Sequence, residues 1–229
     1  ILAFASTIHD RVFFLNGQLD LFDIAIEGDR SLLSALDKRG GALIIGAHVG
    51  SFEVMRAIGR SQAGRDVAMA MYAENARKIS ATLEALNPRL KADIIQLGHL
   101  SAMLEIRDRL QAGVLVGMLG DRSSGDEPGQ QLMFLDAPAV FPVGPFRVAA
   151  MLRCPVYFMA GLYLGGNRYR IVLERLADFS QVPAGAGTAP VDAAVLAYAA
   201  AVQRHCLAHP YNWFNFFDIW ESANPVAAG

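Results

Sequence analysis

Short apolar runs alternate with segments of helical periodicity from residue 42 to residue 163, and this alternation constrains the fold more than any other feature of the chain. The run Ala42-Leu43-Ile44-Ile45 is apolar at every position, as expected for a strand that is covered on both faces of a sheet. Strands that alternate with helices form parallel sheets, because a parallel pair needs a long crossover and a helix supplies it. The sequence therefore predicts an α/β fold with a single domain and a mostly parallel central sheet flanked by helices.

The expected elements cover most of the chain. Strands are expected at residues 12–15, 22–26, 42–47, 67–72, 92–97, 114–119, 131–135, 156–163 and 169–173. Helices are expected at residues 29–38, 51–62, 75–86, 100–111, 144–153 and 191–208. A chain of 229 residues can hold one large α/β domain or two small ones, and no repeat or long linker divides this one. We therefore expect one domain over residues 1–229.

The composition excludes several classes of function. The net charge is −2 and the chain has no basic run or stripe, so nucleic acid is not an expected partner. Patterns of the Gly-x-Gly-x-x-Gly and Walker types are absent from the sequence, so no nucleotide cofactor is expected. Hydrophobic residues make up 53% of the chain, yet it has no apolar run of about 18 residues that would cross a membrane. The 2 cysteines form no disulfide framework, which favours a reducing compartment.

A histidine lies where the strand expected at residues 42–47 ends. Glu53 follows His48 by a spacing that does not share a face on a continuous helix, so His48 must precede the helix, in a turn that Gly50 permits. There Glu53 would accept a hydrogen bond from one imidazole nitrogen and direct the other toward a substrate hydroxyl. Backbone N–H groups at the helix start, near Ser51, would bind the oxyanion of a reacting carbonyl. The pattern predicts a general base, and a buried histidine bonded to a main-chain carbonyl is the alternative.

Charged residues near the ends of other strands are further candidates. Asp121 and Arg122 come directly after the strand expected at residues 114–119, and ligands of open α/β sheets bind at the carboxyl ends of strands. Both are expected to bind substrate, and a loop ion pair is the alternative. Arg77 and Lys78 are a candidate anion site for an acceptor phosphate or a phosphopantetheine group, and a solvated helix face is the alternative.

Four segments together resemble a known family. The block from His48 to Glu53 resembles the His-x4-Asp/Glu motif of glycerolipid-type acyltransferases, and the chain is most similar to the bacterial late acyltransferases of lipid A biosynthesis. Three later segments agree with that family in order and spacing, namely residues 111–122 with an acidic turn, residues 134–145 with Pro-Ala and Gly, and Arg153-Cys-Pro-Val156. The resemblance covers residues 40–165.

The resemblance implies transfer of an acyl group from an acyl carrier protein or a coenzyme A thioester to a hydroxyl of a lipid or glycolipid-like acceptor, with no bound cofactor. It implies His48 as general base, Glu53 as its orienting partner, and acceptor or structural contacts at Asp121 and Arg122. It also implies association with the cytoplasmic face of the bacterial inner membrane, often through an N-terminal helix that this chain would lack. The expected partners are acyl carrier protein, a lipid or pigment acceptor and the membrane surface.

Two features depart from the family pattern. Late acyltransferases carry a basic stretch after a Tyr-x-Trp motif, whereas Tyr211 to Trp220 contains no Arg or Lys, which argues against a phosphorylated lipid A acceptor. The acidic turn reads Gly120-Asp121-Arg122 and not the usual Asp-Gln-Asp type. These departures resemble a side branch, the acyltransferases found beside aryl-polyene pigment genes. The aromatic residues of the last stretch either line an acyl pocket, face a membrane, or close the core.

Other functions are alternatives. A serine hydrolase or thioesterase needs a Gly-x-Ser-x-Gly elbow, and the nearest approach, at residues 59–63, lies inside an expected helix. A non-catalytic lipid-binding domain would keep the same fold, and a filled cleft beside His48 would favour it. His205 and His209 share one helix face, but the chain has no His-Glu-x-x-His pattern and no second cysteine pair, so no metal is expected.

Overall fold

The structure is a computed structural model that describes residues 1–28, 40–55, 67–77, 81, 93–122, 128–183 and 185–220. Its helices are α1 (Leu2–Leu15), α5 (Leu100–Gln111), α6 (Gly144–Leu152) and α7 (Ala189–Ala208), with single 3-10 turns at Leu19–Leu21, Phe179–Gln181 and Pro210–Asn212. Its strands are β1 (Asp23–Gly28), β2 (Ala42–Gly46), β3 (Val67–Tyr72), β4 (Ile94–Leu97), β5 (Leu115–Leu119), β6 (Gly129–Phe134), β7 (Ala137–Pro142), β8 (Pro155–Tyr163) and β9 (Arg168–Asp178).

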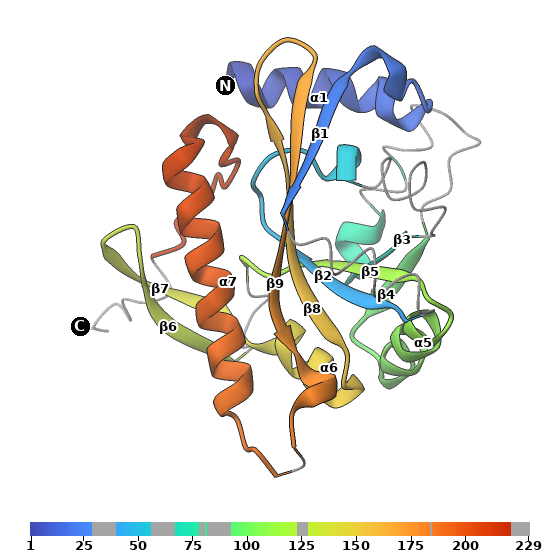
Figure 1. Cartoon of the computed structure of the whole chain (residues 1–229), viewed down its shortest axis with the longest axis vertical. Coiled ribbons are helices and arrows are strands. Elements are labelled where there is room, and N and C mark those ends of the chain that lie inside the picture. The colour runs from blue at the N-terminus through green and yellow to red at the C-terminus, as the bar shows by residue number, and fades with distance from the viewer. Residues whose placement is uncertain are drawn as a thin grey trace.

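A seven-stranded sheet forms the centre of the molecule, with the strand order β1-β9-β8-β2-β5-β3-β4 (Figure 1). All neighbouring pairs are parallel except β8 and β9, which pair antiparallel through the turn that joins them. Strands β1 and β9 therefore run opposite to the other strands of the sheet. This architecture confirms the predicted fold class, a single α/β domain with a mostly parallel sheet flanked by helices.

The two central strands, β2 and β5, are neighbours in space although β3 and β4 lie between them in the sequence. Their register runs from Ala42 opposite Leu115 to Gly46 opposite Leu119, so both strands end at the same level of the sheet. The residues of β2 are buried along its whole length, as its apolar sequence predicts. Any two residues that follow these strands at the same distance are consequently brought side by side at the carboxyl edge.

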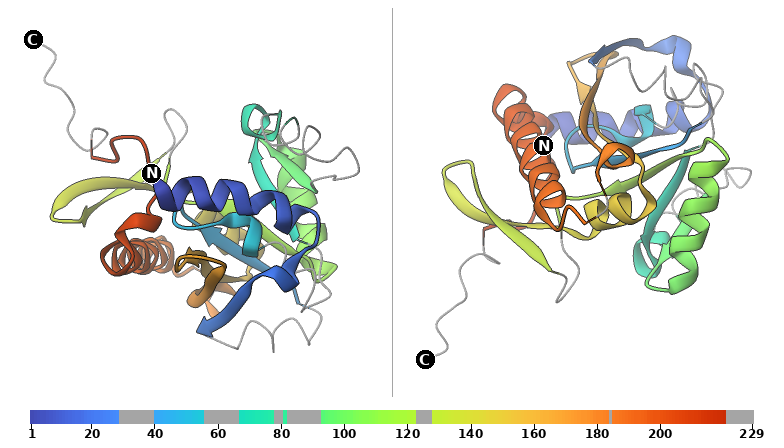
Figure 2. Two further views of the ribbon diagram at one scale, coloured as in Figure 1. Left: turned by 90° about the horizontal axis from the view of Figure 1, so that it is seen from above. Right: turned by 60° about the horizontal axis from the view of Figure 1, so that its bottom comes forward.

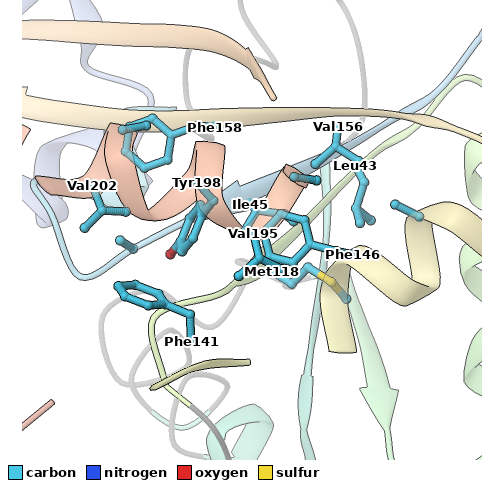
Figure 3. Packing of buried hydrophobic residues seen from close by; sticks show 14 of the residues in the cluster. Leu43, Ile45, Met118, Phe141, Phe146, Val156, Phe158, Val195, Tyr198 and Val202 are labelled. Atoms are coloured by element: carbon cyan, nitrogen blue, oxygen red, sulfur yellow. The ribbon is translucent and has the colours of Figure 1, made fainter. Parts of the chain in front are cut away.

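The larger part of the core lies on the sheet face that is covered by α5, α6 and α7. Figure 3 shows Leu43 and Ile45 of β2 and Met118 of β5 facing Val195, Tyr198 and Val202 of α7, with Phe146 of α6 beside them. Alternate residues of the central strands point to this face because side chains of a strand alternate between its two sides. The apolar face of α7 buries small and branched residues against these strands, and this packing fixes the helix along the sheet.

The opposite face of the sheet is covered by α1 and by the helical turn at residues 52–55. Phe14 of α1 stacks edge-on against Tyr169 of β9 with ring centroids 5.2 Å apart, and Val54 and Met55 belong to the same apolar cluster. The Tyr169 hydroxyl donates to Oδ2 of Asp10 over 2.6 Å, so one buried polar contact also ties α1 to the sheet. Burial, followed by this carboxylate, raises the pKa of Tyr169 well above its ordinary value.

Strands β6 and β7 form a separate antiparallel hairpin that projects beside α7, as the two views of Figure 2 show. Phe134 and Phe141 of this hairpin are fully buried against each other, and they also contact Trp213 and Tyr198 of α7, respectively. In the part of the chain that the structure describes, no helix is both long and apolar enough to span a membrane.

Three sequence expectations differ from the observed elements. The strand expected at residues 12–15 is wrong, because these residues form the last turn of α1 and bury Phe14 and Leu15. A short apolar run fits a strand and the inner face of a helix equally well, which explains the error. Strand β7 was not expected, since Pro138 and Pro142 favour a loop, but prolines are tolerated in a two-stranded edge arrangement. Strand β9 extends to Asp178, well beyond the expected end.

The other expected strands are confirmed within a few residues, and so are the helices expected at 100–111, 144–153 and 191–208. The helix expected at 29–38 lies outside the described residues. Of the helices expected at 51–62 and 75–86, the structure describes helical residues at 52–55 and 73–77.

Candidate active site

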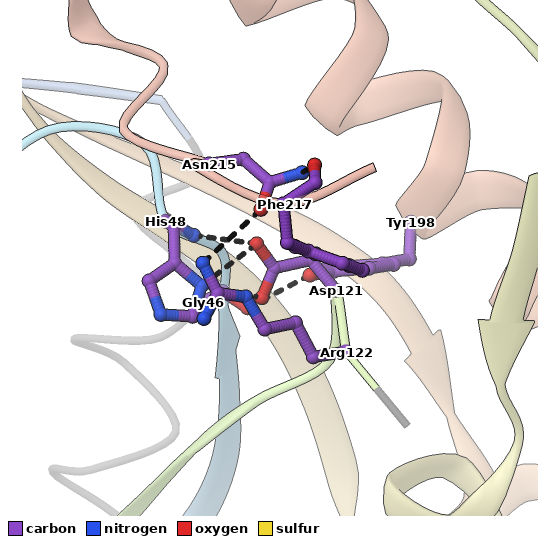
Figure 4. A network of polar contacts seen from close by, with 7 residues as sticks. All are labelled: Gly46, His48, Asp121, Arg122, Tyr198, Asn215 and Phe217. Atoms are coloured by element: carbon purple, nitrogen blue, oxygen red, sulfur yellow. Dashed lines mark hydrogen bonds and ion pairs between the residues drawn. The ribbon is translucent and has the colours of Figure 1, made fainter. Parts of the chain in front are cut away.

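The loops after β2 and β5 bring a histidine and an aspartate together at the carboxyl edge of the sheet. Nδ1 of His48 lies 3.0 Å from both carboxylate oxygens of Asp121, and the main-chain N–H of His48 donates to Oδ2 over 2.8 Å (Figure 4). The two residues meet because each follows its strand by the same distance, beyond the paired residues Gly46 and Leu119. One carboxylate thus holds both the ring and the backbone of His48.

The contact with Asp121 determines which nitrogen of His48 is free. An ionised carboxylate accepts hydrogen bonds and cannot donate them, so the proton of a neutral imidazole must lie on Nδ1. Nε2 then carries a lone pair, and within the described part of the chain it has no hydrogen-bond partner. The Asp121 side chain is only 2% exposed, whereas that of His48 is 29% exposed. A buried anion behind a ring that is open on its other side is the arrangement of a general base.

Helix α7 supports this pair through a tyrosine. The Tyr198 hydroxyl donates to the main-chain oxygen of Gly46 over 2.8 Å, where β2 ends. Burial raises the pKa of Tyr198 well above its ordinary value, and the negative charge of Asp121 raises it further, so the phenol keeps its proton. Gly120 permits the close approach of these elements, since a Cβ at this position would lie 2.6 Å from Ile45 Cγ2 and 3.2 Å from the Tyr198 ring.

Glu53, which the sequence suggests as the partner of His48, lies elsewhere. Its Oε1 is 2.7 Å from Nε of Arg11 on α1, and the N–H is not aligned with that oxygen, so the contact is an ion pair and not a hydrogen bond. The carboxylate bonded to the His48 ring is that of Asp121. A catalytic role of Glu53 stays a prediction, but the orienting contact expected of it is made by Asp121. The physical reason is that Glu53 belongs to the helical turn on the α1 face, while His48 turns toward the loop after β5.

Ser51 begins the helical turn at residues 52–55 and is 3% exposed. Its main-chain N–H donates to the oxygen of Gly161 over 2.7 Å, and its hydroxyl lies 3.5 Å from the N–H of Val54 in the position of a helix cap. The neighbouring Gly50 has φ +72°, and a Cβ there would lie 2.1 Å from the oxygen of Gly161. This backbone is already bonded to β8, so Ser51 has a structural role here, and its expected contact with substrate stays a prediction.

Arg122 follows Asp121 at the sheet edge and reaches Asn215 and Phe217, near the end of the described chain. Its Nη2 donates to Oδ1 of Asn215 over 3.1 Å, and its guanidinium lies 4.6 Å from the ring centroid of Phe217 (Figure 4). Arg122 is exposed, so one side of its charge is open to solvent. Both carboxylate oxygens of Asp121 are bonded to His48, so the Asp121 side chain is less available than that of Arg122 for a direct contact with substrate.

The candidate anion site is described only in part. Arg77 is exposed at residues 73–77, directly after β3, and Lys78 lies outside the described residues. The role of these two residues stays a prediction.

The C-terminal segment, which we define as Pro210–Phe217, contains both buried and exposed aromatic residues. Phe214 is 9% exposed and stacks with Phe4 of α1 at 5.2 Å between ring centroids, so it closes the core. Phe216 also contacts Phe4, yet it is 71% exposed, and Tyr211 is 83% exposed. This end of the molecule therefore presents aromatic surface to its surroundings, close to the loop that carries Arg122.

The two histidines near the end of α7 do not meet on a common ligand. Nε2 of His205 is hydrogen-bonded to Oε1 of Glu174 on β9 over 2.6 Å. The pKa of His209 is lowered, mainly by burial. Among the described residues, no cluster of His, Cys, Asp and Glu could hold a metal ion. Burial raises the pKa of the Cys154 thiol to about 11 and that of Cys206 to about 12, so neither is a ready nucleophile.

Sequence reasoning missed several residues of this site. Tyr198 lies in an alanine-rich stretch of α7, and Arg11 lies in a segment that was expected to lead into a strand, so neither carried a signal. Asn212 and Asn215 lie among aromatic residues that draw more attention. Asp121 is a predicted site residue, because it directly follows an apolar strand as His48 does. Its contact with His48 could not be predicted without knowing that these two strands are neighbours in the sheet.

Comparisons with known proteins agree with this geometry. The family model described as bacterial lipid A biosynthesis acyltransferase matches residues 10–221, which includes the strands that carry His48 and Asp121, α7 and the C-terminal segment. No curated protein shows significant sequence similarity to the chain. The match spans nearly all of the chain and includes every residue of the site, so the chain belongs to the bacterial lipid A biosynthesis acyltransferase family.

Proposed function

We propose that this protein transfers a fatty acyl group from an acyl carrier protein or coenzyme A thioester to a hydroxyl of a lipid or glycolipid-like acceptor, with His48 as general base. The family supports acyltransferase activity in lipid biosynthesis. The observation that carries the mechanism is the pair of 3.0 Å contacts between Nδ1 of His48 and Asp121, which leaves Nε2 free at the carboxyl edge of the sheet. This assigns to Asp121 the orienting role that the sequence motif suggests for Glu53.

In the proposed reaction, Nε2 of His48 removes the proton of the acceptor hydroxyl as its oxygen attacks the thioester carbonyl. The new C–O bond forms, the tetrahedral intermediate collapses, and the C–S bond breaks. The imidazolium then returns its proton to the leaving thiolate, which departs as the free thiol. The Asp121 carboxylate stabilises the imidazolium between these steps. General-base catalysis contributes on the order of 10²- to 10⁴-fold, and fixing the two substrates together contributes more.

The surroundings of His48 suit an apolar donor chain. Leu119 at the end of β5 is 42% exposed, and Tyr72 at the end of β3 is 40% exposed. Strands β5 and β3 are parallel neighbours, so both side chains lie at the carboxyl edge that also carries His48. In the register that pairs Ala68 with Val116, these two side chains point to opposite faces of the sheet, and an acyl chain laid against either one would remove apolar surface from water.

The acceptor side of the proposal rests on the C-terminal segment and the start of α1. Leu2, Phe216 and Phe217 are exposed, Phe217 lies 4.6 Å from the guanidinium of Arg122, and residues 210–220 contain no cationic side chain. Aromatic side chains are enriched where a protein meets the headgroup region of a membrane. We therefore propose that this end contacts the cytoplasmic membrane surface and presents the hydroxyl of a lipid or pigment acceptor, with at most a single anionic group.

The test is a reconstituted transfer reaction. The purified protein is incubated with acyl carrier protein or coenzyme A carrying a labelled fatty acid, together with a lipid extract from cells that lack the gene. Mass spectrometry should find one acceptor that gains a single acyl group, and the same species should be missing from untreated extracts. A His48→Gln variant serves as the control and should not produce it.

Two outcomes would contradict the proposal. Release of free fatty acid at the same rate with and without the extract would indicate a thioesterase. Tight binding of acyl chains without turnover of either thioester would indicate a lipid-binding domain of the same fold.

A further inference from the structure

The C-terminal segment holds the backbone of the turn that carries His48. The N–H of Phe214 donates to the main-chain oxygen of His48 over 2.7 Å, and the N–H of Gly50 donates to the oxygen of Asn212 over 2.8 Å. Between these bonds, Val49 and Trp213 form an antiparallel bridge. The turn from His48 to Gly50 is therefore paired, residue by residue, with a segment that lies more than 160 residues later in the chain.

The side chain of Asn212 fixes this segment to the sheet. Its Oδ1 accepts from the N–H of Tyr163 over 2.7 Å, and its Nδ2 donates to the oxygen of the same residue over 3.0 Å. Tyr163 is the last residue of β8, which pairs with β2. Asn212 is 4% exposed, so these bonds are shielded from water. A carboxamide carries a donor and an acceptor side by side, which matches the N–H and C=O of one extended residue; aspartate lacks the donor and leucine lacks both.

The same segment also reaches the second half of the catalytic pair. Asn215 accepts from Arg122, and Phe217 packs under its guanidinium, so Arg122, directly after Asp121, is held as well (Figure 4). The His48 backbone and Arg122 thus share one support, and Asn212 attaches this support to β8.

We propose that Asn212 is a positioning residue, which sets the orientation of the His48–Asp121 pair through the main chain at Gly50 and His48 without contacting substrate. The proposal rests on the proposed function for the identity of the base. Without the Asn212 amide, the N–H and C=O of Tyr163 lose their partners, the segment separates from β8, and the His48 turn follows it. The ring can then leave the carboxylate, and Nδ1 no longer has a fixed acceptor.

The experiment compares Asn212→Ala and Asn212→Asp with Asn167→Ala. Asn167 is the matched control because its Nδ2 also donates to a main-chain oxygen, that of Leu21, over 3.0 Å, but it ties the β8–β9 turn to the residues before β1 and not to the C-terminal segment. We expect Asn212→Ala to lower kcat by about 10- to 100-fold, since a misplacement of about 1 Å has effects of this size. KM should stay within about threefold of the original value, because substrate contacts are not removed. Asn212→Asp should lie between, and Asn167→Ala should leave both constants unchanged.

A spectroscopic readout separates this proposal from the proposed function. In ¹⁵N spectra of the histidine rings, His48 should appear as the Nδ1–H tautomer in the original protein and in Asn167→Ala, and as a tautomer mixture in Asn212→Ala. Should the original protein transfer no acyl group, the function fails, yet the tautomer comparison still decides the role of Asn212. A folded Asn212→Ala protein with an unchanged His48 spectrum would overturn the positioning role.

Hydrogen exchange covers the case in which the Asn212 variants do not fold. In the original protein, the amides of Gly50 and Phe214 should exchange slowly, at rates similar to those of β8. Rapid exchange of these amides would show that the segment does not hold the turn and would contradict the proposal.

Discussion

Two histidine–carboxylate pairs that join distant elements of the described chain are chemically alike and differ in what surrounds them. His48 contacts Asp121 through Nδ1 at the carboxyl edge of the sheet, and its side chain is 29% exposed. His205 of α7 contacts Glu174 of β9 through Nε2, and its side chain is 13% exposed. The His205 ring also stacks on Phe158, at 5.6 Å between centroids and an angle of 17°. Arg204 forms a second ion pair with Glu174.

The two pairs differ in which member is more buried, and in whether the carboxylate has a second side-chain partner. At His48 the carboxylate is buried and serves one ring, so the imidazole is both oriented and open. At His205 the imidazole lies flat against Phe158, and its carboxylate partner contacts two side chains of α7. The first pair is therefore arranged for proton transfer and the second for attaching a helix to a strand. A histidine near an acid is thus informative only when the position of the other ring nitrogen is known.

The sharpest test of this comparison exchanges each histidine for glutamine. His48→Gln should lower the rate of acyl transfer by about 10²- to 10⁴-fold, which is the usual contribution of a general base. His205→Gln should leave the rate within a small factor and lower thermal stability instead. Transfer rates and melting curves of both variants provide the measurement. Equal losses of activity in the two would remove the distinction between the pairs.

The carboxylates provide the next test. Asp121→Asn removes the charge that stabilises the imidazolium and the acceptor that fixes its tautomer, so we expect a loss on the order of 10²-fold in kcat. Glu174→Gln is the matched control and should leave kcat unchanged. If Asp121→Asn retains most of its activity at saturating substrate, another group must orient His48.

Glu53 tests whether the sequence motif or the position in the structure decides which acid acts with His48. Because Glu53 pairs with Arg11 across the α1 face, Glu53→Gln should lower kcat by less than about tenfold and destabilise the fold by about 1 kcal/mol. The double exchange Arg11→Glu with Glu53→Arg should recover part of the lost stability. A loss for Glu53→Gln as large as that for Asp121→Asn would restore Glu53 to a catalytic role.

The smallest expected effect is a dependence of stability on pH at the structural pair. The pKa of Glu174 is lowered, first through its hydrogen bond with His205 and also through Arg204, despite the opposing effect of burial. The unfolded chain therefore binds the proton more readily than the folded one. The resulting stability, about 1 kcal/mol for a partly exposed pair, is complete above the unfolded pKa near 4.5 and is lost as the pH falls through the lower folded value. Denaturant melts of the original protein and of Glu174→Gln should converge as the solution is acidified.

The sequence predicts the fold class and the histidine because both depend on local patterns. Apolar runs define β2 and β5, and a turn with Gly50 places His48 at the end of a strand. The acid that contacts His48 could not be chosen from spacing, because the sheet order that makes β5 the neighbour of β2 is a long-range property. The motif suggests Glu53, the acid nearest to His48 in the sequence. In the structure, Glu53 pairs with Arg11, and the carboxylate bonded to the His48 ring is that of Asp121.

Strand β7 and the role of Asn212 were missed for a related reason. Prolines lower the expectation of a strand, although an edge position tolerates them. A lone asparagine among aromatic residues carries no local signal, and its bonds to Tyr163 arise only when the last part of the chain returns to β8.

The separation of His48 and Asp121 by 73 residues has a consequence for biosynthesis. A ribosome that has delivered β2 has made the base without its acid, and one that has delivered β5 has made both without the support from Asn212. The emerging polypeptide would remain inert toward thioesters until the C-terminal segment docks, so catalytic competence would begin with the return of that segment to β8.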